Sequence, residues 1–106
     1  MREKSYQYGG ISFEWDEAKA KANAEKHGVT FAEAASTWDD DEAVTRGDPA
    51  HSWEESRFLR LGISSSARLL LVVHCYRGAN GSIRIVSARR ATKKEEALYA
   101  EFRRMA

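Results

Sequence analysis

Three strand-like runs in the second half of the chain constrain the fold most strongly. They span residues 57–63, 69–76 and 82–89, and short polar stretches separate them. The second separator ends in Asn80-Gly81, a pair that favours a tight hairpin turn. Leu69 to Val73 is apolar without alternation, which is typical of a central strand covered on both faces. We therefore expect an antiparallel sheet with this run at its centre.

The residues before these runs predict a further strand and two helices. Ile11 to Trp15 alternates apolar and polar side chains, as a half-buried strand does. Asp16 can then cap a helix of good helix formers, and Gly28 can end that helix in a left-handed conformation. Thr30 and Glu33 have the spacing of a capping box, so a second, short helix should follow.

The end of the chain predicts a third helix. Thr92 and Glu95 again have capping-box spacing. Leu98, Phe102 and Met105 then recur at helical spacing, and we expect them to form the buried face of this helix.

These patterns together predict one α+β domain over residues 1–106. Its central antiparallel β-sheet should carry two N-terminal helices and a C-terminal helix packed on it. Residues 1–10 are expected to form a loose N-terminal lead, and residues 39–54 a polar surface connection with a brief strand near Val44.

Composition excludes several classes of protein. No apolar stretch approaches the roughly 20 residues of a membrane span, and the amino terminus lacks the apolar run of a secretion signal. The single Cys75 cannot form an internal disulfide, so we expect a cytoplasmic protein. His27, His51 and His74 show no metal-ligand spacing, and no glycine-rich nucleotide motif is present. We expect neither a metal nor a cofactor.

Arginines provide the best candidates for a binding site, although the net charge is only +1. Arg57, Arg84 and Arg89 lie near the ends of predicted strands, and Glu55 is two residues from Arg57. Guanidinium groups match the geometry of phosphate oxygens. Strict alternation sends Arg84 and Arg89 to opposite faces, so a shared site requires a bulge or a strand end near Ser87-Ala88.

The arginines, and a second pair of charged residues formed by Lys26 and His27, also have purely structural interpretations. The arginines could line a solvated sheet face or pair with carboxylates such as Glu95 and Glu96. Lys26 and His27 close the first predicted helix, where cations are stabilised by the helix dipole, or they could supply charge and proton transfer. The sequence alone leaves both alternatives open.

A set of short motifs in fixed order closely resembles the BrnT toxin family, and the match covers nearly the whole chain beyond Gly10. The motifs are Trp15-Asp16, Lys19, Asn23, Lys26-His27-Gly28-Val29, Phe31, Ala34, Glu55-x-Arg57, Gly62, Arg84-Ile85-Val86-Ser87-Ala88-Arg89, Ala91 and Tyr99. The resemblance implies a RelE-like ribonuclease fold and a type II toxin that halts translation by cleaving RNA. It also implies a BrnA-type antitoxin with a ribbon-helix-helix DNA-binding part, through which any contact with DNA would be indirect.

The resemblance and the arginines together suggest metal-independent cleavage, in which the ribose 2′-OH attacks the adjacent phosphate. Arg57, Arg84 and Arg89 would hold the phosphate. Glu55 or His27 would act as the base, and His27 or Lys26 would assist the leaving oxygen. Two alternatives remain: a catalytically silent interaction module that acts as co-repressor with a DNA-binding antitoxin, and a domain in which these residues serve only packing.

Overall fold

The computed structural model describes residues 3–50, 56–77 and 81–105. It contains a single six-stranded sheet with the strand order β1-β2-β6-β5-β4-β3. No helix in these ranges has the length and apolar content that a membrane crossing requires. The elements are β1 (Glu3–Tyr8), β2 (Ile11–Asp16), α1 (Glu17–His27), α2 (Phe31–Ala35), the 3-10 helix η1 (Ser36–Asp39), β3 (Val44–Gly47), β4 (Arg57–Ile63), β5 (Leu69–Arg77), β6 (Ser82–Arg90) and α3 (Lys93–Met105).

The first residues do not form a loose lead, contrary to the sequence-based expectation. Residues 3–8 form β1, which pairs with β2 in antiparallel register along its whole length. The turn between them is made by Gly9 and Gly10, both with positive φ, a conformation that favours glycine. Tyr6 lies against Trp15 with ring centroids 5.3 Å apart. The cross-strand aromatic contact and the glycine turn explain why this short polar segment is ordered.

The prediction of an antiparallel sheet holds for four of the five strand pairs. β1–β2, β3–β4, β4–β5 and β5–β6 are antiparallel, whereas β2 and β6 run parallel, so the sheet is mixed. The periodicity of a strand indicates which side chains face the core but not which strand lies beside it. The sequence patterns therefore indicated five of the six strands but not the parallel pairing of β2 with β6.

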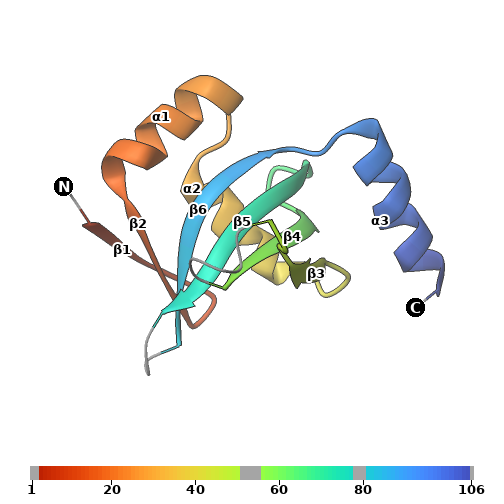
Figure 1. Cartoon of the computed structure of the whole chain (residues 1–106), viewed down its shortest axis with the longest axis horizontal. Coiled ribbons are helices and arrows are strands. Elements are labelled where there is room, and N and C mark those ends of the chain that lie inside the picture. The colour runs from red at the N-terminus through yellow and green to blue at the C-terminus, as the bar shows by residue number, and fades with distance from the viewer. Residues whose placement is uncertain (1–2, 51–55, 78–80, 106) are drawn as a thin grey trace.

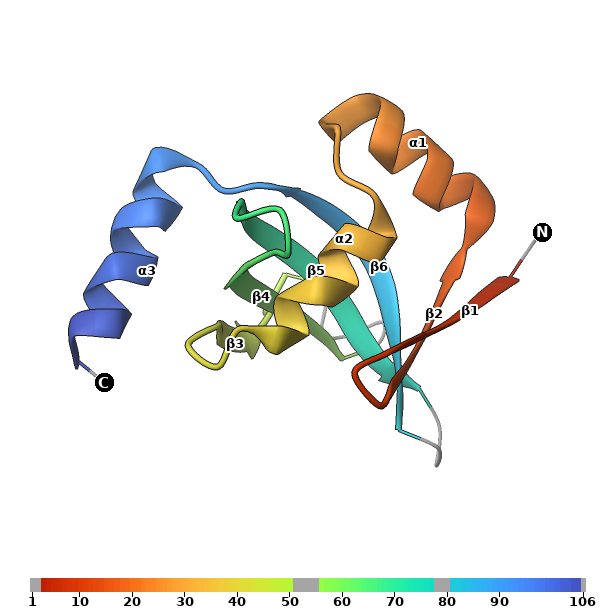
Figure 2. The same ribbon diagram turned by 180° about the vertical axis from the view of Figure 1, so that it is seen from behind.

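Helices α1 and α2 cover one face of the sheet, as Figure 2 shows with α2 in front of β5 and β6. We call the opposite face the open face; it is turned toward the viewer in Figure 1, between α1 and α3. The main core lies between the sheet and the two N-terminal helices. It consists of Phe13, Trp15, Val29, Phe31, Ala34, Ala35, Leu70, Val72, Ile83, Ile85 and Ala88.

Helix α3 stands beside the sheet and does not bury the face expected from the sequence. Leu98 and Phe102 are each 44% exposed and Met105 is 73% exposed. The buried residue of α3 is Tyr99, whose hydroxyl donates a hydrogen bond of 2.6 Å to Asp40 Oδ2. Leu98, Phe102 and Met105 do lie on one face of a helix, as their spacing predicts. The helix is anchored instead through the neighbouring face, which carries Tyr99.

Asn23 joins α1 to a stretch of the β6 edge that no strand of the described residues covers. β2 pairs with β6 only at Ile83 and Arg84. Farther along, the Asn23 side chain donates to Ala88 O at 2.8 Å and accepts from Ala88 N at 3.1 Å. It also donates to Val29 O at 3.0 Å. The amide thus replaces a missing neighbouring strand, because it offers both a donor and an acceptor.

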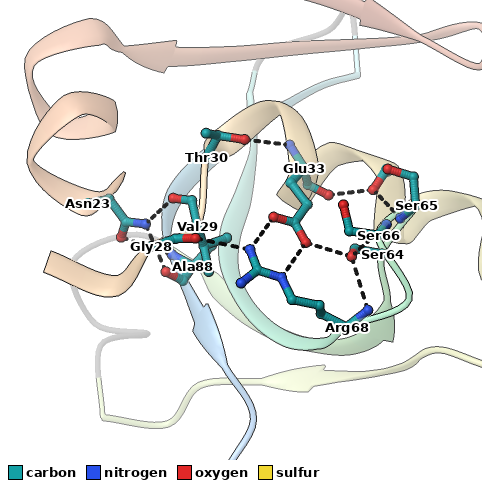
Figure 3. A network of polar contacts seen from close by, with 11 residues as sticks. Asn23, Gly28, Val29, Thr30, Glu33, Ser64, Ser65, Ser66, Arg68 and Ala88 are labelled. Atoms are coloured by element: carbon teal, nitrogen blue, oxygen red, sulfur yellow. Dashed lines mark hydrogen bonds and ion pairs between the residues drawn. The ribbon is translucent and has the colours of Figure 1, made fainter. Parts of the chain in front are cut away.

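The connection between α1 and α2 is fixed by a second polar network, drawn in Figure 3. Arg68 donates to Gly28 O at 2.9 Å and forms a two-pronged ion pair with Glu33. Glu33 also accepts from Ser64 Oγ at 2.7 Å. The hydrogen bonds from Arg68 hold the pKa of Glu33 below its ordinary value. The network fixes the carboxyl end of α1 against the β4–β5 turn.

An imidazole lies in the interior beside the main core. His74 is fully buried and contacts the rings of Trp38 and Phe58, with centroids 4.9 and 5.8 Å away. Within the described residues, neither ring nitrogen has a hydrogen-bond partner. Burial, together with the nearby charge of Arg60, lowers the pKa of His74 to about 4. His74 is therefore a neutral part of the interior near neutral pH.

Replacing Asn23 by alanine should destabilise the fold strongly. The Asn23→Ala variant leaves an N–H and two C=O groups without partners, so we expect a loss of about 2–4 kcal/mol in the free energy of unfolding. The exposed Lys21 on the same helix provides a control. Lys21→Ala should change the free energy of unfolding by less than about 0.5 kcal/mol. Urea unfolding measures both, and equal effects would contradict this role of the amide.

The buried His74 should make stability depend on pH. Its folded pKa of about 4 lies below the ordinary value of about 6.5, so the unfolded state binds more protons between these values. Stability should therefore fall as the pH drops from about 6.5 toward 4, by on the order of 3 kcal/mol in total. His74→Phe keeps an aromatic ring and should remove this slope. The urea concentration at the unfolding midpoint is measured for the parent and for His74→Phe at about pH 7, 6 and 5. The same dependence of stability on pH in both proteins would refute this role of His74.

Candidate functional site

The open face brings together arginines from neighbouring strands. Cys75 of β5 is directly opposite Arg57 of β4 and Arg84 of β6. Directly opposed residues of an antiparallel pair point to the same face. The two arginines therefore flank Cys75 in one row across the sheet. Leu71, four residues earlier on β5, is opposite Arg89 and belongs to the same face.

A bulge in β6 allows Arg84 and Arg89 to share this face. Val73 pairs with Ser87, but the next residue, His74, pairs with Ile85, so Val86 is an extra residue in the strand. One extra residue reverses the alternation that would otherwise separate two positions five apart. The spacing of the two arginines predicts such an irregularity near Ser87-Ala88. The structure has it one residue earlier.

Arg84 is held by two carboxylates. Its guanidinium donates to Glu14 Oε2 at 2.8 Å and to both carboxylate oxygens of Glu3. Its side chain is only 17% exposed, and these hydrogen bonds raise its pKa further above the ordinary value. Arg84 thus joins β6 to β2 and β1. A phosphate would have to compete with both carboxylates for this side chain.

Arg89 forms a two-pronged pair with Glu95 at the start of α3, with both N–O distances 2.9 Å. Glu95 accepts as well from Thr92 N at 2.9 Å, and Thr92 Oγ1 accepts from Glu95 N at 3.2 Å. This confirms the predicted capping box. The bonds from Arg89 hold the pKa of Glu95 below its ordinary value. The structure therefore contains the ion pair between Arg89 and Glu95 that was one of the structural interpretations of the sequence.

Arg57, the remaining arginine candidate, is half-buried at the first position of β4. The carboxylate proposed to act with it, Glu55, lies outside the residues that the structure describes. The structure therefore places Arg57 on the open face and leaves the Glu55–Arg57 pairing untested.

Lys26 and His27 lie beside the bulge of β6, apart from the arginine row. They line a pocket of about 270 Å³ between α1 and β6, which we call the α1–β6 pocket. Ser87, on the open face, lines it too, so the pocket adjoins that face. The full lining is Lys19, Ala22, Asn23, Lys26, His27, Val86 and Ser87.

The charges around the α1–β6 pocket suit an anion. Its lining contains two lysines and a histidine but no carboxylate. Four other hollows in the described part of the chain each contain at least one acidic side chain. Two lysines without a lining carboxylate suit a phosphate group, because ammonium groups attract its negative charge. The α1–β6 pocket is therefore the best candidate for a phosphate site.

Sequence reasoning did not assign a functional role to Lys19 or Ser87. Lys19, Asn23 and Lys26 stand at i, i+4 and i+7, so they share one helix face. That spacing could have placed Lys19 with Lys26. No comparable signal existed for Ser87, because its position depends on the bulge. Among the described residues, no group of three or more His, Cys, Asp or Glu side chains could hold a metal ion.

Comparisons with known proteins agree on one family. Residues 15–95 match a family described as "Ribonuclease toxin, BrnT, of type II toxin-antitoxin system". A crystal structure of the Brucella abortus ribonuclease toxin BrnT superposes with a TM-score of 0.58 at 23% identity, covering 74% of this chain and 94% of that one. This likeness supports the mixed α+β fold. No curated protein sequence matches the chain.

Anion binding should depend on the lysines of the α1–β6 pocket. At low ionic strength, we expect the double variant Lys19→Gln, Lys26→Gln to bind inorganic pyrophosphate about tenfold more weakly than the parent. A second double variant, Lys4→Gln, Lys21→Gln, removes the same charge elsewhere and should bind within about twofold. Calorimetry gives the dissociation constants. Equal weakening in both variants would show general charge attraction instead of a site.

Proposed function

The chain belongs to the BrnT family of ribonuclease toxins of type II toxin–antitoxin systems, and on this premise we propose that it is a metal-independent endoribonuclease that inhibits translation. The observation that carries the proposal is the α1–β6 pocket, where Lys19, Lys26 and His27 surround a space free of lining carboxylates beside the open face. An RNA backbone can place one phosphate there and extend across the arginine-bearing strands.

The proposed reaction needs no group beyond protein side chains. The ribose 2′-OH attacks the adjacent phosphorus, the bond from phosphorus to the 5′ oxygen breaks, and a 2′,3′-cyclic phosphate forms. A base takes the proton of the 2′-OH, and an acid returns a proton to the 5′ oxygen. His27 is a candidate for either step, Glu55 for the base, and Lys26 for the group that assists the leaving oxygen.

The three open-face arginines are proposed to stabilise the negative charge that develops on phosphate. Arg57 and Arg84 flank Cys75, and Arg89 is opposite Leu71. Arg84 and Arg89 are held in place by carboxylates, which fixes their positions before RNA arrives. Such preorganisation favours catalysis, although phosphate must draw the guanidinium groups partly away from their acidic partners.

A BrnA-type antitoxin with a ribbon-helix-helix DNA-binding part is the proposed partner. Membership of a type II system implies a protein antitoxin. The net charge of +1 provides little general attraction to RNA, so binding to naked RNA should be modest and sensitive to salt. DNA would be contacted only through the antitoxin.

Mapping RNA ends after induction of the chain alone tests the proposal. We expect new ends with 5′-OH and cyclic phosphate groups, both in cells and with purified protein in the presence of EDTA. Cleavage lost on chelation would contradict the metal-free reaction. Intact RNA with normal growth would favour the silent co-repressor module.

Comparing variants of Arg89 and of its partner Glu95 distinguishes a role of Arg89 in RNA cleavage from a role in stability alone. Both Arg89→Ala and Glu95→Ala remove the same ion pair and should lower stability by about 1 kcal/mol. Only Arg89→Ala removes the positive charge, and we expect it to reduce RNA cleavage at least about 100-fold. Glu95→Ala should cleave RNA within about threefold of the parent. Equal losses of cleavage in the two variants would mean that Arg89 serves only the fold.

A further inference from the structure

One apolar surface of the described chain is only partly covered by the rest of the fold. Leu98, Phe102 and Met105 form an exposed stripe along α3, as described above. In Figure 1 this helix stands away from the strands, at the side of the open face. The stripe lies beyond residue 95, where the match to the family ends. It is therefore a feature of this chain that the family match does not explain.

The stripe continues into a groove over the sheet. Leu98 lines a hollow of about 80 Å³ together with Val44, Leu59, Leu61 and Leu71 from three strands. These strand residues belong to the open face, since Leu71 is opposite both Leu61 and Arg89. We call the stripe and this hollow together the α3 groove. It provides a path from the end of α3 toward the arginines.

Unpaired positive charge lies at the rim of the α3 groove. Arg46 and Lys94 both line a hollow of about 420 Å³ that shares Leu98 with the groove. Neither forms an ion pair within the described chain. The two acidic residues of the same hollow are already engaged, Glu95 with Arg89 and Glu101 with Arg104. The charge available to a partner is therefore positive.

We propose that the α3 groove is the docking site for an acidic, amphipathic segment of the protein antitoxin. The proposal rests on the proposed function, because the type II family supplies the partner. Apolar side chains of the segment would cover Leu98, Phe102 and Leu71, and its carboxylates would pair with Arg46 and Lys94. A segment that follows the groove reaches Arg89 and blocks the face where RNA is proposed to bind.

The charges argue against a second copy of the chain as the occupant. A two-fold axis through the groove would place the same surface of each copy against the other. Arg46 and Lys94 would then face a rim of the same charge without free carboxylates.

Titration calorimetry with the cognate antitoxin tests the docking site. We expect Phe102→Glu, Met105→Glu to raise the dissociation constant at least about tenfold, because the added carboxylates repel an acidic segment. Arg46→Glu, Lys94→Glu should act in the same direction. Ala100→Glu adds a charge to the exposed far side of α3 and should stay within about twofold. The substituted residues are exposed, so circular dichroism should show folded proteins.

Two results would overturn the proposal. One is antitoxin binding that is unchanged in both groove variants. The other is a chain that is dimeric by light scattering and becomes monomeric in Phe102→Glu, Met105→Glu, since a second copy would then occupy the groove. RNA cleavage without antitoxin is measured separately for each variant. If the parent does not cleave RNA, the proposed activity fails, while the calorimetry still decides whether the α3 groove binds the antitoxin.

Discussion

The side-chain amide of Asn23 is the interaction on which the arrangement of this molecule depends. β2 accompanies β6 for only a short distance, and without Asn23 the rest of that edge would present unpaired backbone groups near Ala88. Because the amide satisfies both the N–H and the C=O of Ala88, α1 must lie alongside the bulged part of β6. That position places Lys26 and His27 beside Ser87 and so creates the α1–β6 pocket.

Much of the fold followed from local signals in the sequence. Asp16 caps α1 and Gly28 ends it with a positive φ, as predicted. The three long strands also followed from periodicity. The predicted Asn80-Gly81 turn includes residue 80, which lies outside the described residues. Pairings between distant segments could not be read in this way, because nothing local in β2 specifies β6 as its neighbour. For the same reason, the local sequence of residues 1–10 predicts a loose lead although residues 3–8 form a strand: their partner, β2, supplies most of their order.

The candidate site shows the same division between local and distant information. The sequence identified arginines and the Lys26-His27 pair as chemically suitable, and it identified the need for a bulge. It could not identify the carboxylates that hold Arg84, since Glu3 is separated from it by 81 positions. Nor could periodicity show that α3 is anchored by Tyr99 and leaves Leu98 exposed. Helical spacing shows that side chains share a face, whereas the tertiary fold decides whether that face is covered.

The position of Glu95 couples two regions that are otherwise separate. One carboxylate caps the first turn of α3 and holds Arg89 of β6. A ligand that draws Arg89 away weakens the start of α3, and a ligand that stabilises α3 strengthens the hold on Arg89. Thermodynamic linkage requires each ligand to weaken the binding of the other by the same factor, so binding at one place lowers affinity at the other even without steric overlap. A single side chain can thus make RNA and a partner on α3 antagonists.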